Sequence, residues 1–151
     1  MALMAAHRKS FIRRSIPSLR EEISTRRVRI RRQEEDIETL KTQRDKIQEL
    51  IDFTSMLGDI VDILYSNIDY YHGDNRDRSD ERAGAIRDAI NDQKAAHQRN
   101  INIINTSITS LDGRISSLEN SNNIANNAIT NMLSEWRNGN AGMSFPNSSV
   151  I

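Results

Sequence analysis

The chain has 151 residues, enough for one domain, and its 36% of apolar residues is low for a compact globule with a thick core. It contains no cysteine, which excludes disulfides, zinc–thiolate sites and cysteine nucleophiles. The net charge is zero, yet residues 1–33 carry ten Lys or Arg against Glu21 and Glu22. This asymmetry favours an acidic protein, a nucleic acid or a membrane surface as partner of the basic end, or pairing with acids of the same or a neighbouring chain. No apolar run approaches the roughly 18–20 residues of a transmembrane span.

Residues 1–16 contain no acid and are rich in Arg and Ser. This composition resembles an organellar presequence, but a basic, partly disordered leader accounts for it without any import signal. We expect the first helix to begin after this leader. Ser15 is a suitable N-cap that places Pro17 in the first turn, and Ser18 followed by Glu21 matches a capping box.

The first long helix is predicted from a stripe of apolar residues at helical spacing between residues 17 and 70. Arg26, Gln33 and Arg44 interrupt the stripe, so the basic end should pack loosely or against a partner elsewhere. The stripe widens between residues 53 and 64, and we expect the firmest packing there, next to the turn. Gly58 indicates either a close approach of two helices or a slight kink. The stripe consists of Leu19, Ile23, Ile30, Ile37, Leu40, Ile47, Ile51, Val61, Leu64 and Ile68.

The strongest turn signal is the stretch Tyr71-His72-Gly73, which Asp74 and Asn75 follow, because Gly takes positive φ at a helix end without steric cost. A second helix should begin between residues 77 and 79 and end near residue 137, and residues 138–151 should form a flexible tail. The side of this helix that packs against the other forms a seam. If Asn122 is buried in this seam, it would fix the register of the helices and the choice of partner; the alternative is that its side chain lies at the edge of the seam, exposed to solvent. The predicted seam consists of Ile86, Ile90, Gln93, His97, Ile101, Ile104, Ile108, Leu111, Ile115, Leu118, Asn122, Ala125, Ile129, Met132 and Trp136.

These elements predict an all-α fold. Its core is a long, coiled-coil-like antiparallel helical hairpin over residues 17–137, with the turn near residues 70–78. Two helices alone bury one narrow stripe each, so we expect a homo-oligomer or a partner helix pair to complete the packing. The residues expected at packing or partner interfaces are Phe53, Leu57, Ile60, Leu64, Ile104, Ile108, Leu111, Ile115 and Trp136.

No arrangement of residues predicts catalysis, a metal or a cofactor. His7, His72 and His97 are scattered, and the acids between residues 34 and 38 form a solvated face beside basic residues. Residues 74–80 are acidic, but they lack the central Gly and terminal Glu of a calcium loop. We find neither a Ser–His–Asp arrangement nor a phosphate-binding Gly-rich loop. The sequence therefore predicts a non-enzymatic protein.

The order of long amphipathic helix, Tyr71-His72-Gly73 and second amphipathic helix resembles the WXG-type helical hairpins of type VII secretion, which share an aromatic-x-Gly turn. Residues 110–119 (SLDGRISSLE) are similar to a segment in the second helix of the longer members found beside LXG-domain toxins. The resemblance covers about residues 35–120. Tyr71 stands where the family has Trp. Acidic residues follow Tyr65 and Tyr70 at the fourth position, before the second helix, whereas the family's secretion signal follows that helix.

This resemblance implies a bacterial chaperone or adaptor that binds the helical domain of a secreted toxin and targets it to type VII secretion. Such a protein would act in the cytoplasm or be secreted together with the toxin. The alternative is a self-assembling coiled-coil scaffold, such as a phage or virion component, which needs no foreign partner. Nucleic acid is a weaker candidate partner, because Phe11 is the only aromatic residue of the basic segment on which a base could stack.

Overall fold

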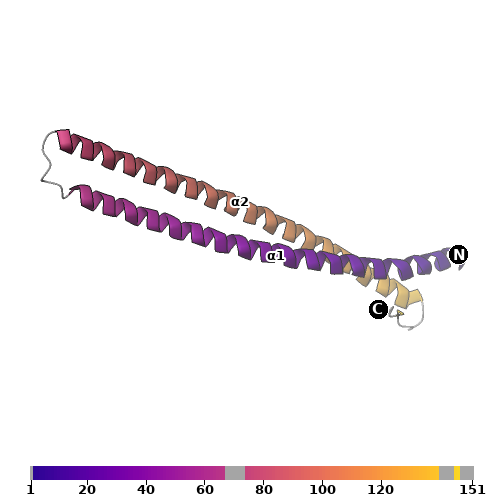
Figure 1. The fold of residues 1–151 in the computed structure, drawn as a ribbon. Coiled ribbons are helices and arrows are strands. Elements are labelled where there is room, and N and C mark those ends of the chain that lie inside the picture. The colour runs from indigo at the N-terminus through magenta and orange to yellow at the C-terminus, as the bar shows by residue number, and fades with distance from the viewer. Residues whose placement is uncertain (1, 67–73, 140–144, 147–151) are drawn as a thin grey trace. The chain divides into compact units, whose positions relative to one another are not determined.

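The computed structural model confirms an all-α helical hairpin. It describes residues 2–66, 74–139, 145 and 146, and these residues include no strand. Helix α1 spans Ala2–Ser66 and helix α2 spans Asp74–Gly139 (Figure 1). The predicted turn Tyr71-His72-Gly73 lies outside the described residues. Helix α2 begins earlier than expected, at Asp74.

The helices form two compact units. Unit 1 comprises Met1–Glu35 and Leu111–Ile151, and unit 2 comprises Asp36–Ser110. Within each unit, a stretch of α1 runs antiparallel to a stretch of α2 (Figure 1). In unit 1, Arg8 binds Glu135 across the helix pair. In unit 2, Asp62 binds Arg87 in the same way.

The inward side of α1 is a continuous seam with alternating steps of four and three residues. The seam confirms the predicted stripe between residues 19 and 61, and it extends the stripe towards the N-terminus. Leu64 lies outside it. The buried or half-buried residues that follow these steps are Ile12, Ile16, Leu19, Ile23, Arg26, Ile30, Gln33, Ile37, Leu40, Arg44, Ile47, Ile51, Thr54, Gly58, Val61 and Tyr65.

The expected start of the first helix at Ser15 or Ser18 is wrong, because α1 begins at Ala2 and contains Pro17. Residues 2–16, which we expected to form a separate leader, belong to this helix. Ile12 and Ile16 are only 2% and 0% exposed, and burial of each contributes roughly 2 kcal/mol. Together these contributions offset the roughly 3 kcal/mol that an interior proline costs.

The core cluster lies in unit 1, so the prediction that the firmest packing lies next to the turn is wrong. The prediction of a loosely packed basic end is wrong for residues 12–23, which contribute to this cluster, whereas a hollow lies beside Arg27 and Arg31. The wide apolar stripe between residues 53 and 64 does not face α2, because the inward positions there are Thr54, Gly58 and Val61. The core cluster of unit 1 consists of Ile12, Ile16, Ile23, Ala125 and Ile129, against which Leu19, Met132, Leu133, Trp136 and Phe145 pack.

The predicted seam of α2 is confirmed between residues 101 and 136, where every member is buried or half-buried. Nearer the turn, Ile90 and His97 are half-buried as predicted, but the other two predicted positions are wrong by one residue. Ile86 and Gln93 are exposed, whereas Ala83 is buried and Lys94 is half-buried. The alternation of steps of four and three, continued back from Ile101, reaches residues 97, 94, 90, 87 and 83, which explains the shift.

The C-terminal end of α2 carries Trp136, the last residue of the predicted seam. The ring of Phe145 packs edge-on against it, with centroids 5.3 Å apart and an interplanar angle of 75°. Trp136 therefore packs within its own chain, against the core of unit 1. The rest of the predicted flexible tail, residues 140–144 and 147–151, lies outside the described residues.

We expect Gly58→Ala to raise the free energy of unfolding by about 0.5–1 kcal/mol, because Ala favours helix and restricts the unfolded chain. A Cβ atom at Gly58 would lie 3.8 Å from Cγ2 of Ile90, an ordinary contact, so the helices need no glycine there. Urea unfolding followed by circular dichroism measures the change. Gly113→Ala is the matched control, since a Cβ there has no neighbour within 4 Å. Destabilisation by Gly58→Ala alone would contradict this reasoning.

Candidate helix-binding face

Helix α1 carries a second apolar seam within unit 2. Its members are separated by alternating steps of three and four, and between 39% and 60% of each residue's surface is exposed. Such spacing places side chains in one stripe along a helix. At 3.6 residues per turn, this stripe lies about 110° around α1 from the seam that faces α2. The members are Leu50, Phe53, Leu57, Ile60 and Leu64.

Helix α2 extends this surface on the same side of unit 2. Leu57 directly precedes the seam residue Gly58, and Ile86 directly precedes Arg87, whose backbone holds the equivalent seam position while its side chain is exposed. In an antiparallel pair, residues at these equivalent positions flank the seam on the same side. We call this surface the apolar face. It consists of Leu50, Phe53, Leu57, Ile60 and Leu64 of α1 with Ile86, Ala89, Ala96 and Ile103 of α2.

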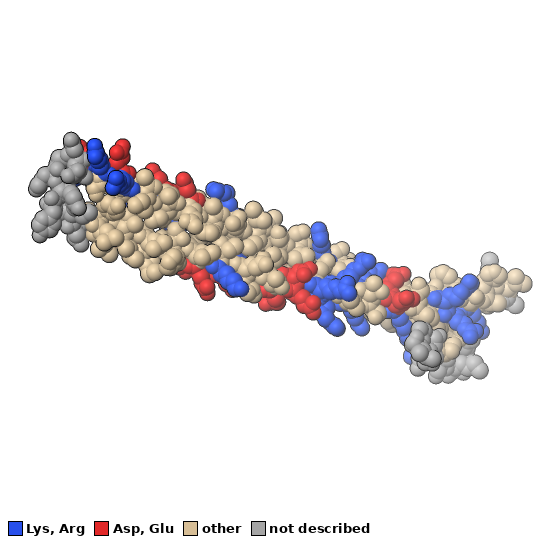
Figure 2. Space-filling view, in the orientation of Figure 1, with Lys and Arg blue, Asp and Glu red and all other residues tan. Residues whose placement is uncertain are grey.

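The opposite side of unit 2 is polar. It contains the Asp62–Arg87 ion pair and a hollow of about 250 Å³. Figure 2 shows a broad band without charged side chains over unit 2, with charges along its borders. On the side in view, the charged side chains of unit 2 therefore lie mainly at its borders. The hollow is lined by Ser55, Gly58, Asp59, Asp62, Arg87, Ile90, Asn91 and Lys94.

The apolar face is large for a surface that has no binding role. The exposed fractions of its large side chains, with Met56 beside them at 51%, leave on the order of 700 Å² open to solvent. The largest apolar patch of a typical monomer covers roughly 300–600 Å². One partner of a standard protein–protein interface contributes roughly 800 Å². The size of the face therefore matches that of an interface.

The structure divides the nine predicted interface residues between two environments. Phe53, Leu57, Ile60 and Leu64 lie on the apolar face and are exposed. The other five, on α2, are buried or half-buried seam residues: Ile104, Ile108, Leu111, Ile115 and Trp136. The prediction omitted Leu50 and Ile103 and assigned Ile86 to the seam. The steps between residues 50 and 64 were the signal that could have revealed the second seam.

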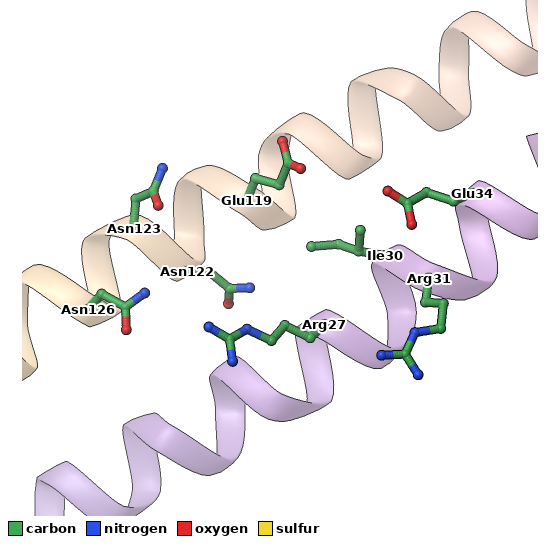
Figure 3. A pocket seen from close by; sticks show the side chains of 8 residues that line it. All are labelled: Arg27, Ile30, Arg31, Glu34, Glu119, Asn122, Asn123 and Asn126. Carbon is green, nitrogen blue, oxygen red and sulfur yellow. The ribbon is translucent and has the colours of Figure 1, made fainter.

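Unit 1 contains a hollow of about 500 Å³ (Figure 3). Arg27 extends towards Asn122 of α2, whereas Arg31 is directed away from it (Figure 3). Asn122 is only 7% exposed, so the alternative that its side chain lies at the edge of the seam, exposed to solvent, is wrong. Both basic and acidic side chains line this hollow, so its charge favours neither an anionic nor a cationic ligand. The lining residues are Arg27, Ile30, Arg31, Glu34, Glu119, Asn122, Asn123 and Asn126.

An exposed ion pair links the start of α1 to the end of α2. Nε and Nη2 of Arg8 donate to the two carboxylate oxygens of Glu135 over 2.8 and 2.9 Å. These hydrogen bonds lower the pKa of Glu135 and raise the pKa of Arg8. Because water screens both groups, the pair positions the helix ends and adds little stability.

The described residues include no group of three or more His, Cys, Asp or Glu side chains placed to hold a metal ion. Neither described helix has a stretch long and apolar enough to cross a bilayer. Comparison with known proteins found no matching family model, no matching curated protein and no matching solved structure.

Proposed function

We propose that the chain is a non-enzymatic helical partner protein that binds another helical protein through the apolar face of unit 2. The observation that carries this proposal is the second seam of α1, which repeats every three and four residues and remains exposed in the chain on its own. A three-four seam is the pattern with which a helix packs against another helix. A partner that supplies a complementary stripe would remove this surface from water.

The geometry of unit 2 favours a helical hairpin as that partner. In a four-helix bundle each helix packs against two neighbours, so it needs two apolar stripes on adjacent sides. Helix α1 has two such stripes, about 110° apart. Helix α2 presents Ile86, Ala89, Ala96 and Ile103 on the same side. A second helix pair on the apolar face would complete the bundle.

The more specific part of the proposal rests on the resemblance to WXG-type hairpins. On that basis the partner is the helical domain of a secreted toxin, and this chain acts as its chaperone or adaptor in type VII secretion. Residues 110–119, which carry part of the resemblance, lie in α2. Leu111 and Ile115 face inward there, and Asp112 and Arg114 are exposed.

The test is co-expression with a helical protein encoded beside this chain, followed by light scattering of the purified material. We expect a complex that the double variant Leu57→Gln/Ile60→Gln abolishes, because both side chains lie on the apolar face. The matched control is Val28→Gln/Ile124→Gln in unit 1. These residues are 46% and 62% exposed but belong to unit 1 and are not members of the apolar face, so the complex should persist.

Two results would count against this proposal. A stable homodimer that Leu57→Gln/Ile60→Gln dissociates would favour the alternative, a self-assembling scaffold. A soluble monomer that binds no helical protein would remove the role of the apolar face altogether. Circular dichroism of both variants verifies that they remain as helical as the unchanged chain.

A further inference from the structure

We infer that the occupant of the apolar face is a foreign amphipathic helix pair whose apolar stripe is flanked by Lys or Arg. This inference rests on the proposed function and specifies the chemistry of the partner. The reason is the charge around the face. The centre of the face is uncharged, and each outer flank of unit 2 carries more acids than bases.

The acidic flanks follow from the positions of the acids on the two helices. Residues directly before those of the apolar face lie about 100° further around each helix, on its outer side, and this outer stripe continues along each helix in steps of three and four. On α1 the outer stripe spans residues 45–63 and holds four acids and no base, together with the exposed Met56 and Ile63. On α2, three acids and Arg99 occupy it within residues 81–102. The exposed acids of both flanks are Asp45, Glu49, Asp52, Asp59, Glu81, Asp88 and Asp92.

Most of these acids have no ionic partner among the described residues. Asp45 pairs with Arg44 at 3.2 Å, and Asp52 accepts a hydrogen bond from Gln48 at 3.1 Å. No described cation lies within ion-pair distance of Glu49, Asp59 or Asp88, or of Asp92. These four carboxylates are available to a cation of a bound partner, although Asp59 also lines the hollow on the polar side of unit 2.

Unit 2 as a whole is also negatively charged. Residues 36–110 contain fourteen Asp or Glu against nine Lys or Arg, a net charge of −5. Lys46 and Arg82 stand at the ends of the apolar face, where a longer partner would extend past it. Between them, the face itself carries no charge. Basic flanks on the partner would therefore meet acids on both outer borders.

This charge pattern argues against two other occupants. A second copy packed on the same face would bring two units of charge −5 together, which adds repulsion to the association. An anionic membrane surface would likewise repel the acidic flanks. A helical partner with basic flanks gains from both the apolar face and the acidic borders.

Two synthetic amphipathic peptides test the inference with the full chain. Both have Leu at alternating three-four spacing, and they differ only in carrying Lys or Glu at the flanking positions. At low ionic strength we expect the Lys peptide to bind about ten-fold more tightly than the Glu peptide. In roughly 0.5 M salt the difference should fall to about two-fold, because exposed charges are then screened.

Three variants assign the binding to the apolar face and its flanks. Leu57→Gln/Ile60→Gln should lose both peptides, and Val28→Gln/Ile124→Gln should keep both. The combined change Glu49→Gln, Asp59→Asn, Asp88→Asn and Asp92→Asn should weaken the Lys peptide until it binds about as well as the Glu peptide. Persistence of the ten-fold preference in this charge variant would overturn the inference.

The remaining outcomes separate this inference from the proposed function. Equal binding of both peptides at the apolar face overturns the charge specificity and leaves the helix-binding role in place. If neither peptide binds and light scattering shows a homodimer that depends on Leu57 and Ile60, both proposals fail. Binding to phosphatidylserine-containing vesicles that Leu57→Gln/Ile60→Gln abolishes would identify a membrane as the occupant and overturn both as well.

Discussion

Ile16→Ala is expected to lower the free energy of unfolding of unit 1 by about 2–4 kcal/mol. Ile16 has no solvent exposure and belongs to the core cluster with Ile12, Ile23, Ala125 and Ile129. Removing three carbon atoms leaves a cavity that the two helices cannot fully close. Urea unfolding followed by circular dichroism measures the loss, and amide hydrogen exchange in residues 2–35 and 111–139 assigns it to unit 1.

The control for Ile16→Ala is Val28→Ala, in the same unit and on the same helix. Val28 is 46% exposed, so its truncation should change the free energy of unfolding by less than about 0.5 kcal/mol. Ile16 directly precedes Pro17, and the comparison therefore also tests the continuation of α1 through the proline. Equal small effects of both substitutions would show that residues before Pro17 do not pack against α2.

Asn122→Leu is expected to raise the free energy of unfolding by about 1–2 kcal/mol. The side chain is 7% exposed, and its Oδ1 atom accepts no hydrogen bond from the described residues. A buried polar atom without a partner costs about 1–3 kcal/mol, and Leu at this seam position buries apolar surface instead. The midpoint of urea unfolding should rise, with an unchanged slope.

The control for Asn122→Leu is Asn126→Leu, one turn further along α2 at an exposed position that lines the same hollow. That change should alter stability by less than about 0.5 kcal/mol. A buried Asn fixes the register of a helix pair, so Asn122→Leu should also permit alternative pairings, visible as a broader mass distribution in light scattering. Destabilisation by Asn122→Leu would mean that its amide is hydrogen-bonded in solution.

The all-α hairpin and the seam of α2 between residues 101 and 136 were predictable from sequence. Both rest on periodicity, which is a local property: residues three and four apart share a helix face whatever they pack against. The course of α1 through Pro17 was not predictable in this way. Ser15 and Ser18 are capping signals that favour a helix start at these residues. Burial of Ile12 and Ile16 in the tertiary core favours a helix that already includes the residues before them, and this burial prevails.

The helical spacing of the apolar residues and the absence of cysteine chemistry follow from the amino-acid sequence alone and do not depend on any partner. The orientation of α1 about its own axis is different. Around residue 57 the helix has two stripes with three-four spacing, and the more apolar one, from Leu50 to Leu64, is the exposed one. Within unit 2, the seam that faces α2 runs in phase from Ile37 to Val61, and side chains on one stretch of helix keep fixed angles to one another about its axis. Packing against α2 over the length of unit 2 therefore outweighs local hydrophobicity and leaves the apolar face exposed.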